Sequence, residues 1–70
     1  MPLSMLNLGD TRVITDFNGK EELKRHLRDL GFIKGERVRL VSENESGLIL
    51  SLKGSRIALN RALAAKIMVV

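Results

Sequence analysis

The chain has 70 residues, a net charge of +4 and no cysteine. A chain of this length buries only about 60% of the surface that its unfolded form exposes, so we expect one domain over residues 1–70 without a deep catalytic cleft. Because neither disulfides nor thiolate metal sites are available, the fold must depend on hydrophobic packing.

Hydropathy and charge limit the expected cellular location of the protein and the classes of partner that it can bind. No segment approaches the roughly 20 apolar residues of a membrane span, and the N-terminal segment lacks the basic and apolar regions of a signal peptide. We therefore expect a cytoplasmic protein that is neither exported by a cleaved signal nor anchored by its own helix. Twelve Lys and Arg residues against eight Asp and Glu are compatible with a nucleic acid, an acidic membrane surface or an acidic protein as the partner.

A strand and then a helix are predicted in the first half of the chain. Residues 11–17 are rich in β-branched and aromatic side chains, which is typical of a strand. Leu23, Leu27 and Leu30 then recur at positions i, i+4 and i+7, the spacing of one helix face. We expect these leucines to pack in the core.

Both ends of this helix carry recognisable signals. Asn18 is expected to cap the N-terminus, with Glu21 three residues later closing a capping box. At the C-terminus Gly31 can adopt the left-handed conformation, and Phe32 can fold back on the leucines. These two residues predict a Schellman motif.

A turn, a strand and a hairpin loop follow. Gly35 supplies the turn, and Val38 and Leu40 then alternate with two arginines, as in a half-buried strand. Residues 43–47 have the composition of a hairpin loop.

The next strand also alternates. Leu48, Leu50 and Leu52 are expected to face the core, which leaves Ile49 facing outward. Ile49 is therefore the apolar residue expected to contribute to a contact patch on the surface.

A tight turn, a strand, one helical turn and a last strand are expected at the C-terminal end. Gly54 can accept a positive φ in the turn, after which Ile57 and Leu59 face the core. Asn60 can cap one turn of helix, and residues 66–70 close the sheet.

Together these elements predict a mainly β fold: a small SH3-like barrel of about five strands, with one helix after the first strand and a short helical turn before the last. Closure of so small a sheet buries its apolar face and removes exposed edges. An OB-fold is the alternative, but its helix usually falls between the third and fourth strands. We expect the long helix to cover an open end of the barrel through its leucines and Phe32.

Two stretches of the sequence, residues 26–41 (HLRDLGFIKGERVRLV) and residues 47–69 (GLILSLKGSRIALNRALAAKIMV), carry a series of apolar and glycine positions in a fixed order. With an N-terminal segment, these positions are Leu3, Leu6, Gly9, Leu27, Leu30, Gly31, Gly35, Val38, Val41, Gly47, Gly54, Ile57, Ala58, Leu59, Ala64, Ile67 and Val69. In this order they resemble the ferrous iron transport protein A (FeoA) family over almost the whole chain. Lys34 departs from the family pattern, where proline is frequent, and Asn60 departs where arginine is frequent.

The resemblance implies an SH3-like accessory protein of bacterial ferrous iron uptake, located in the cytosol and without enzymatic activity. It implies as partner the membrane permease FeoB, whose cytoplasmic part hydrolyses GTP, so that contact with the membrane is indirect. The same domain recurs at the C-terminal end of some metal-dependent repressors. A repressor function is disfavoured here because the chain has no DNA-binding helix pair of its own.

A basic surface is the predicted binding site for this partner. Residues 20–39 contain seven of the twelve Lys and Arg side chains. Such a surface can steer association with an acidic docking site on the permease. The residues predicted to contact the partner are Arg25, Arg28, Lys34, Arg37 and Ile49.

The alternative is a solvated helix surface with local ion pairs, in which Glu21 pairs with Arg25, Arg25 with Asp29 and Glu22 with His26. An arginine that acts in trans on the GTPase of the partner is a sharper hypothesis. It is disfavoured because no arginine lies on a recognisable projecting loop.

Catalysis and metal binding are not expected. His26 is the only histidine and lies in a charged helix without an obvious pocket, so no nucleophile and base can be assembled around it. Glu22 and His26 are spaced i, i+4 and could make a weak transition-metal contact, with Asp29 or a second molecule completing it. A structural zinc site, however, takes four ligands. No cofactor, no resident metal and no small-molecule substrate are therefore expected.

A nucleic-acid-binding SH3-like module is the competing functional class. The chain has no Trp or Tyr, and its only aromatic residues, Phe17 and Phe32, are expected in the core. Single-stranded nucleic acids and proline-rich peptides, which are bound on aromatic surfaces, are therefore disfavoured. Contact with duplex or structured RNA through phosphates alone stays open.

Overall fold

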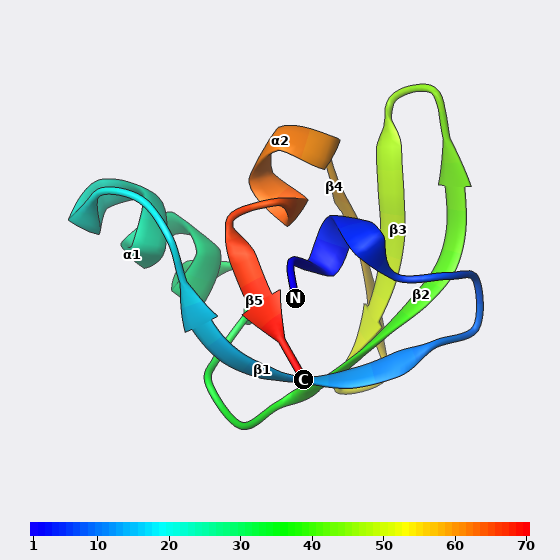
Figure 1. Ribbon diagram of the computed structural model, residues 1–70, viewed down its shortest axis with the longest axis horizontal. Helices are drawn as coiled ribbons and strands as arrows, with labels where there is room; N and C mark the ends of the chain where they lie inside the picture. The colour runs from blue at the N-terminus through cyan, green and yellow to red at the C-terminus, as the bar shows by residue number, and fades with distance from the viewer.

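The computed structural model describes residues 1–70, in which five strands form one antiparallel sheet in the order β4-β3-β2-β1-β5 (Figure 1). A helix follows the first strand and a short helix precedes the last, as the sequence predicts. The elements in chain order are η1 (Leu3–Met5), β1 (Thr11–Phe17), α1 (Glu21–Asp29), β2 (Arg37–Asn44), β3 (Gly47–Leu52), β4 (Ser55–Leu59), α2 (Arg61–Ala64) and β5 (Ile67–Val69).

The sheet bends around a single apolar core. Strand alternation directs Val38 and Leu40 of β2 inward, and the paired residue on β3 opposite Leu40 is Leu50. All fifteen residues of the core cluster are hydrophobic, and no polar side chain is buried with them. Phe32, from the loop after α1, is fully buried, which confirms its predicted place in the core.

Helix α1 begins at Glu21 with Lys20 as its N-cap, and no side chain caps it, so the prediction of an Asn18 capping box is wrong. The reason lies in the sheet. The backbone N–H of Asn18 donates to the carbonyl oxygen of Lys66 at 2.7 Å, which holds Asn18 to the segment before β5. Gly19, at φ +120°, then turns the chain, so that the helix starts two residues later than a cap at Asn18 would allow.

The C-terminal end of α1 confirms the predicted Schellman motif. Gly31 has φ +108°. The N–H of Phe32 donates to the carbonyl oxygen of Leu27 at 3.0 Å, and that of Gly31 donates to Arg28 at 2.9 Å. Leu27 is fully buried, whereas Leu23 and Leu30 are partly buried against the core. Helix α1 therefore contributes its leucine face to the core, as predicted.

Two-residue turns connect β2 to β3 and β3 to β4. Strands β2 and β3 extend to Asn44 and Gly47, so the turn between them is two residues long rather than spanning the expected residues 43–47. The Asn44 side chain accepts hydrogen bonds from the backbone N–H groups of Ser46 and Gly47 at 2.8 and 3.1 Å and stabilises this turn. Between β3 and β4, Lys53 and Gly54 have φ values of +52° and +80°, as in a type I′ turn.

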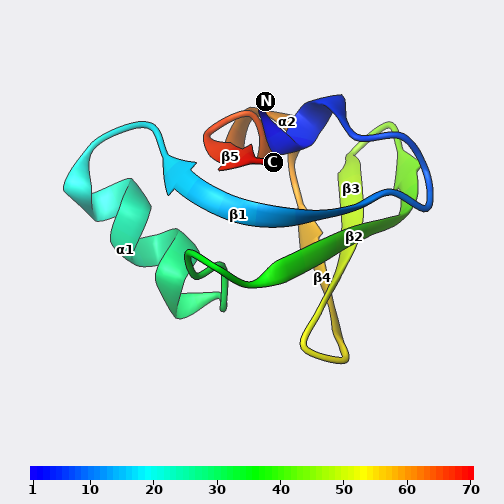
Figure 2. The same cartoon turned by 60° about the horizontal axis from the view of Figure 1, so that its bottom comes forward.

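The two ends of the chain lie together beside β5 (Figures 1 and 2). The N-terminal ammonium group donates to the carbonyl oxygen of Val69 at 2.9 Å, and Pro2 forms a β-bridge with Met68. The side chain of Asn60 caps α2 by accepting from the N–H of Leu63 at 2.8 Å, as predicted. Neither helix has the length and hydropathy of a membrane span.

Candidate partner-binding surface

Four of the predicted binding residues come from three consecutive segments of the chain. Arg25 and Arg28 lie on α1, Lys34 in the loop that follows, and Arg37 at the start of β2, and all four side chains are exposed. The Schellman motif determines how these segments follow one another, because it reverses the chain at the end of α1. The fold thus presents these cations to solvent.

Two of these four cations already have a carboxylate partner. Arg28 Nη2 lies 3.7 Å from Glu21 Oε2, and Lys34 Nζ lies 3.5 Å from Asp16 Oδ1. Arg25 and Arg37 form no ion pair. Because both pairs are largely exposed, water and salt screen them and they contribute little to stability. Both cations can therefore exchange their partner for a stronger acidic one.

The ion pairs predicted along α1 do not form, so that prediction is wrong. Glu21 pairs with Lys24 at 4.0 Å and with Arg28, rather than with Arg25. Lys24 and Arg28 lie three and seven positions beyond Glu21 and share its helix face, so one carboxylate in the first turn serves both. Arg25 consequently has no ion-pair partner.

Asp16, which pairs with Lys34, has a lowered pKa. The backbone N–H of Phe17 donates to Asp16 Oδ1 at 2.8 Å, and this hydrogen bond, followed by the positive charge of Lys34, lowers the pKa of Asp16 below its ordinary value of 3.8. The carboxylate stays charged at neutral pH and holds Lys34 beside the end of β1.

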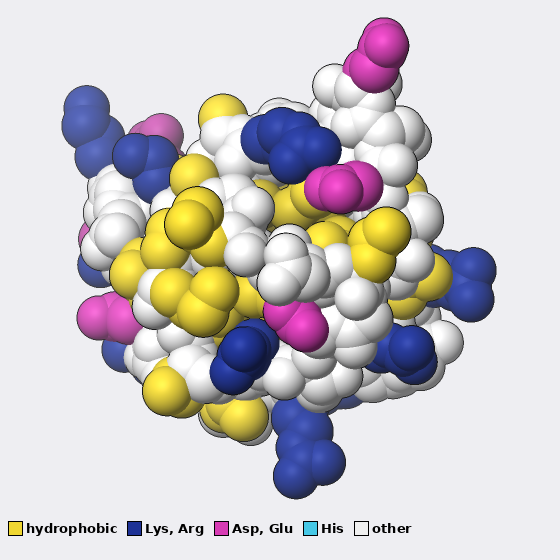
Figure 3. Space-filling model, turned by 45° about the vertical axis from the view of Figure 1, so that its right-hand side comes forward, with side chains coloured by type: hydrophobic (Ala, Val, Ile, Leu, Met, Phe, Trp, Pro, Cys, Tyr) yellow, Lys and Arg dark blue, Asp and Glu magenta, His cyan; other side chains and the backbone are white.

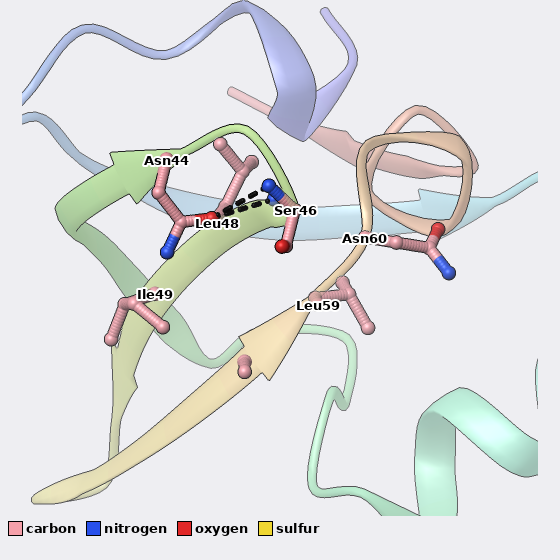
Figure 4. A pocket seen from close by; sticks show the side chains of 8 residues that line it. Asn44, Ser46, Leu48, Ile49, Leu59 and Asn60 are labelled. Atoms are coloured by element: carbon pink, nitrogen blue, oxygen red, sulfur yellow. Dashed lines mark hydrogen bonds between the residues drawn. The ribbon is translucent and has the colours of Figure 1, made fainter.

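Ile49 faces outward, as predicted, but it lies apart from these cations. It is half-buried on β3, next to the β2–β3 turn, whereas α1 is at the other side of the molecule (Figures 1 and 4). It lines a small pocket of about 140 Å³ together with Ala58 of β4 and with Asn44, Ser46, Gly47, Leu48, Leu59 and Asn60. This volume is below the roughly 300 to 1,000 Å³ of typical ligand pockets. Ile49 therefore does not join Arg25 and Arg28 in one contact patch.

The structure reveals a second basic surface that the sequence did not predict as a unit. Arg39 on β2 is in register with Ser51 on β3, and Ser51 with Arg56 on β4. These residues lie on the outer face of the sheet with Arg37. We call Arg37, Arg39 and Arg56 the arginine face. None of the three forms an ion pair, whereas Lys24, Arg28, Lys34, Lys53 and Arg61 do.

The alternation of apolar and polar residues along β2 is enough to predict, from the sequence alone, that Arg37 and Arg39 face outward. Arg56 joins them only through the pairing register of β3 and β4, which no local pattern reveals.

The large apolar side chains that are exposed to solvent do not include Ile49. Most of the large ones belong to the two ends of the chain, and Figure 3 shows hydrophobic side chains clustered on one face between basic ones. The large exposed apolar side chains of the whole chain are Met1, Met5, Leu8 and Val70, with Ile33 in the loop after α1. The large exposed apolar side chains therefore lie outside the set of residues predicted to contact the partner.

The residues offer no complete metal site. No group of three or more His, Cys, Asp or Glu side chains gathers anywhere in the protein, so Asp29 does not complete a site with Glu22 and His26. Two possible ligands on an exposed helix do not fit a structural metal.

Comparisons with known proteins agree with this architecture. The family model described as FeoA domain matches residues 1–70. Among curated proteins, none matches the sequence.

Solved structures show the same fold. A structure described as an iron uptake regulatory protein (FeoA) is similar with a TM-score of 0.92 and 26% identity, over 99% of this chain and 92% of that one. A zinc complex of FeoA from Stenotrophomonas maltophilia, described as an unusual SH3-domain protein, has a TM-score of 0.80 and 34% identity, over 100% of this chain and 89% of that one. A manganese-dependent transcriptional repressor bound to manganese shares the fold over 35% of its own chain, with a TM-score of 0.92 and 20% identity. The SH3-like fold expected from the sequence is thus confirmed.

Proposed function

Because the chain belongs to the FeoA domain family, we propose that it is a cytosolic accessory protein of bacterial ferrous iron uptake that binds the cytoplasmic GTPase part of a FeoB-type permease and modulates transport. Its family ties it to ferrous iron transport. One similar protein is described as a possible bacterial ferrous iron transport activating factor. In this proposal the chain acts by binding, holds no resident metal or cofactor, and meets the membrane only through its partner.

The observation that carries the proposal is the excess of unpaired positive charge on a small protein surface. Seven of the twelve cations have no ion-pair partner, and all seven are exposed. They are Arg12, Lys20, Arg25, Arg37, Arg39, Arg56 and Lys66. Such a surface accelerates association with an acidic protein and selects against basic ones.

A binding assay with the purified cytoplasmic domain of the permease tests the proposal. We expect the protein to bind this domain at physiological salt and to be retained on neither duplex DNA nor RNA. The double variant Arg25→Glu, Arg28→Glu should weaken binding at least about tenfold, because two like charges replace two attractive ones. The matched control Arg12→Glu, Lys66→Glu changes the net charge equally at positions outside α1.

The outcomes separate the two functional classes. Equal losses in both double variants would mean that net charge, rather than α1, governs binding. Retention on nucleic acid with a steep salt dependence, and no binding of the permease domain, would overturn the proposal in favour of a nucleic-acid-binding module.

A further inference from the structure

One edge of the sheet is open. Strand β4 pairs with β3 on one side, and no strand pairs with its other side, because β4 is the last strand in the order β4-β3-β2-β1-β5. The opposite end of the sheet differs, since β5 carries the β-bridge from Pro2 and accepts the N-terminal ammonium group at Val69. Strand β4 therefore offers free backbone along one of its sides.

The free groups on this edge can be identified. Leu52 and Ser55 flank a two-residue turn, so they form a hydrogen-bonded pair, and the antiparallel alternation continues through the pairs Leu50 with Ile57 and Leu48 with Leu59. The N–H and C=O groups of Arg56 and Ala58 must then point away from β3. Neither residue takes part in any of the backbone hydrogen bonds formed outside the helices and strands. Two donors and two acceptors are free.

We propose that an acidic, extended segment of a protein partner adds to β4 as a sixth, antiparallel strand. This inference rests on the proposed function: the cations of α1 attract the permease domain, and β4 supplies the backbone site on which a segment of that domain would dock. A strand in this position makes up to four hydrogen bonds, two to Arg56 and two to Ala58. Main-chain bonds give affinity, and alternate side chains give specificity.

The positive charge of the protein favours an acidic partner segment over a second copy of this chain at the β4 edge. A second copy of this chain, paired antiparallel about Ile57, would place its Arg56 diagonally opposite the first at roughly 7–8 Å. Each copy also carries a net charge of +4, so this pairing is repulsive. The exposed Arg56 thus protects the edge from self-association, as charged residues do on edge strands, while attracting a carboxylate.

The same geometry predicts a side-chain pattern in the partner. A residue opposite Arg56 lies on the outer face, beside the arginine face, and should be Asp or Glu. A residue opposite Ala58 lies beside Ile49 at the pocket shown in Figure 4, and should be apolar. Because the added strand runs antiparallel to β4, the apolar residue precedes the acidic one by two positions.

Amide hydrogen exchange of the ¹⁵N-labelled protein, with and without the permease's cytoplasmic domain, tests this inference. In the free protein the amides of Arg56 and Ala58 should exchange rapidly, and the amide of Ile57 slowly, because only Ile57 is bonded to β3. Addition of the permease domain should slow exchange at Arg56 and Ala58 at least about tenfold.

Two pairs of variants supply an independent readout. Ala58→Pro removes one outward N–H at an edge position that tolerates proline and should weaken binding about tenfold, whereas Ala58→Val keeps the N–H and should change affinity less than about twofold. Arg56→Glu should weaken binding more than Arg56→Lys. Unchanged exchange at Ile57 and Leu48 in each variant establishes that the β3–β4 ladder is intact.

The outcomes also separate this inference from the proposed function. Binding of the permease domain without protection at Arg56 and Ala58, or with full affinity in Ala58→Pro, would overturn the β4 docking site and leave the proposed function standing. No binding at all by the intact protein would overturn the proposed function and this inference together.

Discussion

Gly47, at the start of β3, is the position where a single side-chain carbon would disturb the protein most. A Cβ atom on Gly47 would press on the carbonyl oxygen of Leu59 and lie 2.9 Å from the Cα atom of Asn60. Its φ of +154° also disfavours other residues. Glycine is required at position 47 both because its backbone conformation is unfavourable for other residues and because β3 closely approaches the end of β4 there.

We therefore expect Gly47→Ala to lower the free energy of unfolding by about 2 kcal/mol or more, because the contact atoms belong to backbone that cannot move aside. Urea denaturation measures this loss. Gly54→Ala is the control: its φ of +80° is strained too, but no atom lies within 4 Å of the added carbon. Its cost should be about 1 kcal/mol. Equal losses would show that backbone strain alone acts at Gly47.

The lowered pKa of Asp16 gives a second prediction at the scale of one residue. A carboxylate whose pKa is lower in the folded than in the unfolded protein adds stability above its unfolded value, ordinarily 3.8, and this stability disappears as the pH falls through the folded value. Asp16→Asn should therefore be less stable than the parent at pH 7 and equally stable at the acid end of the titration.

An NMR titration checks the cause. Lys34→Ala should raise the pKa of Asp16 only part of the way toward 3.8, because the hydrogen bond from the N–H of Phe17 remains and is the largest single contribution. A full return to 3.8 in Lys34→Ala would contradict this order of causes.

At the scale of elements, the two helices differ in how their N-terminal ends are stabilised. Helix α2 is four residues long and begins at Arg61, and the side chain of the preceding residue, Asn60, supplies the cap. Helix α1 begins without a side-chain cap, although Glu21 and Glu22 lie in its first turn and favour the helix dipole. The main stabilisation of α1 comes from its C-terminal Schellman motif and from Leu27 in the core.

Substitution of the two asparagines separates these cases. Asn60→Ala should cost about 1 kcal/mol of unfolding free energy, because it leaves the N–H of Leu63 without a partner. Asn18→Ala should cost less than about 0.5 kcal/mol, because the Asn18 side chain caps no helix and its backbone bond to Lys66 remains. Thermal or urea unfolding of both variants measures the difference, and the opposite order would restore the capping box at Asn18.

For the whole molecule, the decisive feature is a small SH3-like fold with more positive charge than its own carboxylates can pair. Five ion pairs join exposed or half-buried side chains, and the rest of the cations face solvent. Long-range attraction from such a surface acts on the rate of encounter and is screened within about 8 Å at physiological salt.

We expect the association rate with the permease's cytoplasmic domain to fall several-fold between about 50 and 500 mM NaCl, with a smaller change in the dissociation rate. Stopped-flow mixing measures both rates. The Arg39→Gln, Arg56→Gln variant should flatten the salt dependence of association. A salt-independent association rate would mean that the basic surface does not steer the encounter.

Much of the fold could be predicted from local pattern. The order of strands and helices, the inward residues of β2 and β3, the Schellman motif and the cap at Asn60 all depend on interactions between residues close in sequence, so alternation and turn chemistry reveal them. The predicted Asn18 cap failed because a contact with Lys66, far along the chain, decided where α1 begins. The ion pairs of α1 were wrong because helical spacing leaves several partners within reach of one carboxylate.

The amino-acid sequence by itself determined which residues are apolar, where the period changes and how much charge the protein carries, and these suffice for an SH3-like barrel and for the family resemblance. Only the tertiary structure decided which cations share a surface and which backbone groups stay free. Arg39 and Arg56 come together across β3 through strand register, and the β4 edge is open because β5 pairs with β1 instead. Register and strand order are set by packing between distant segments, which local pattern does not encode.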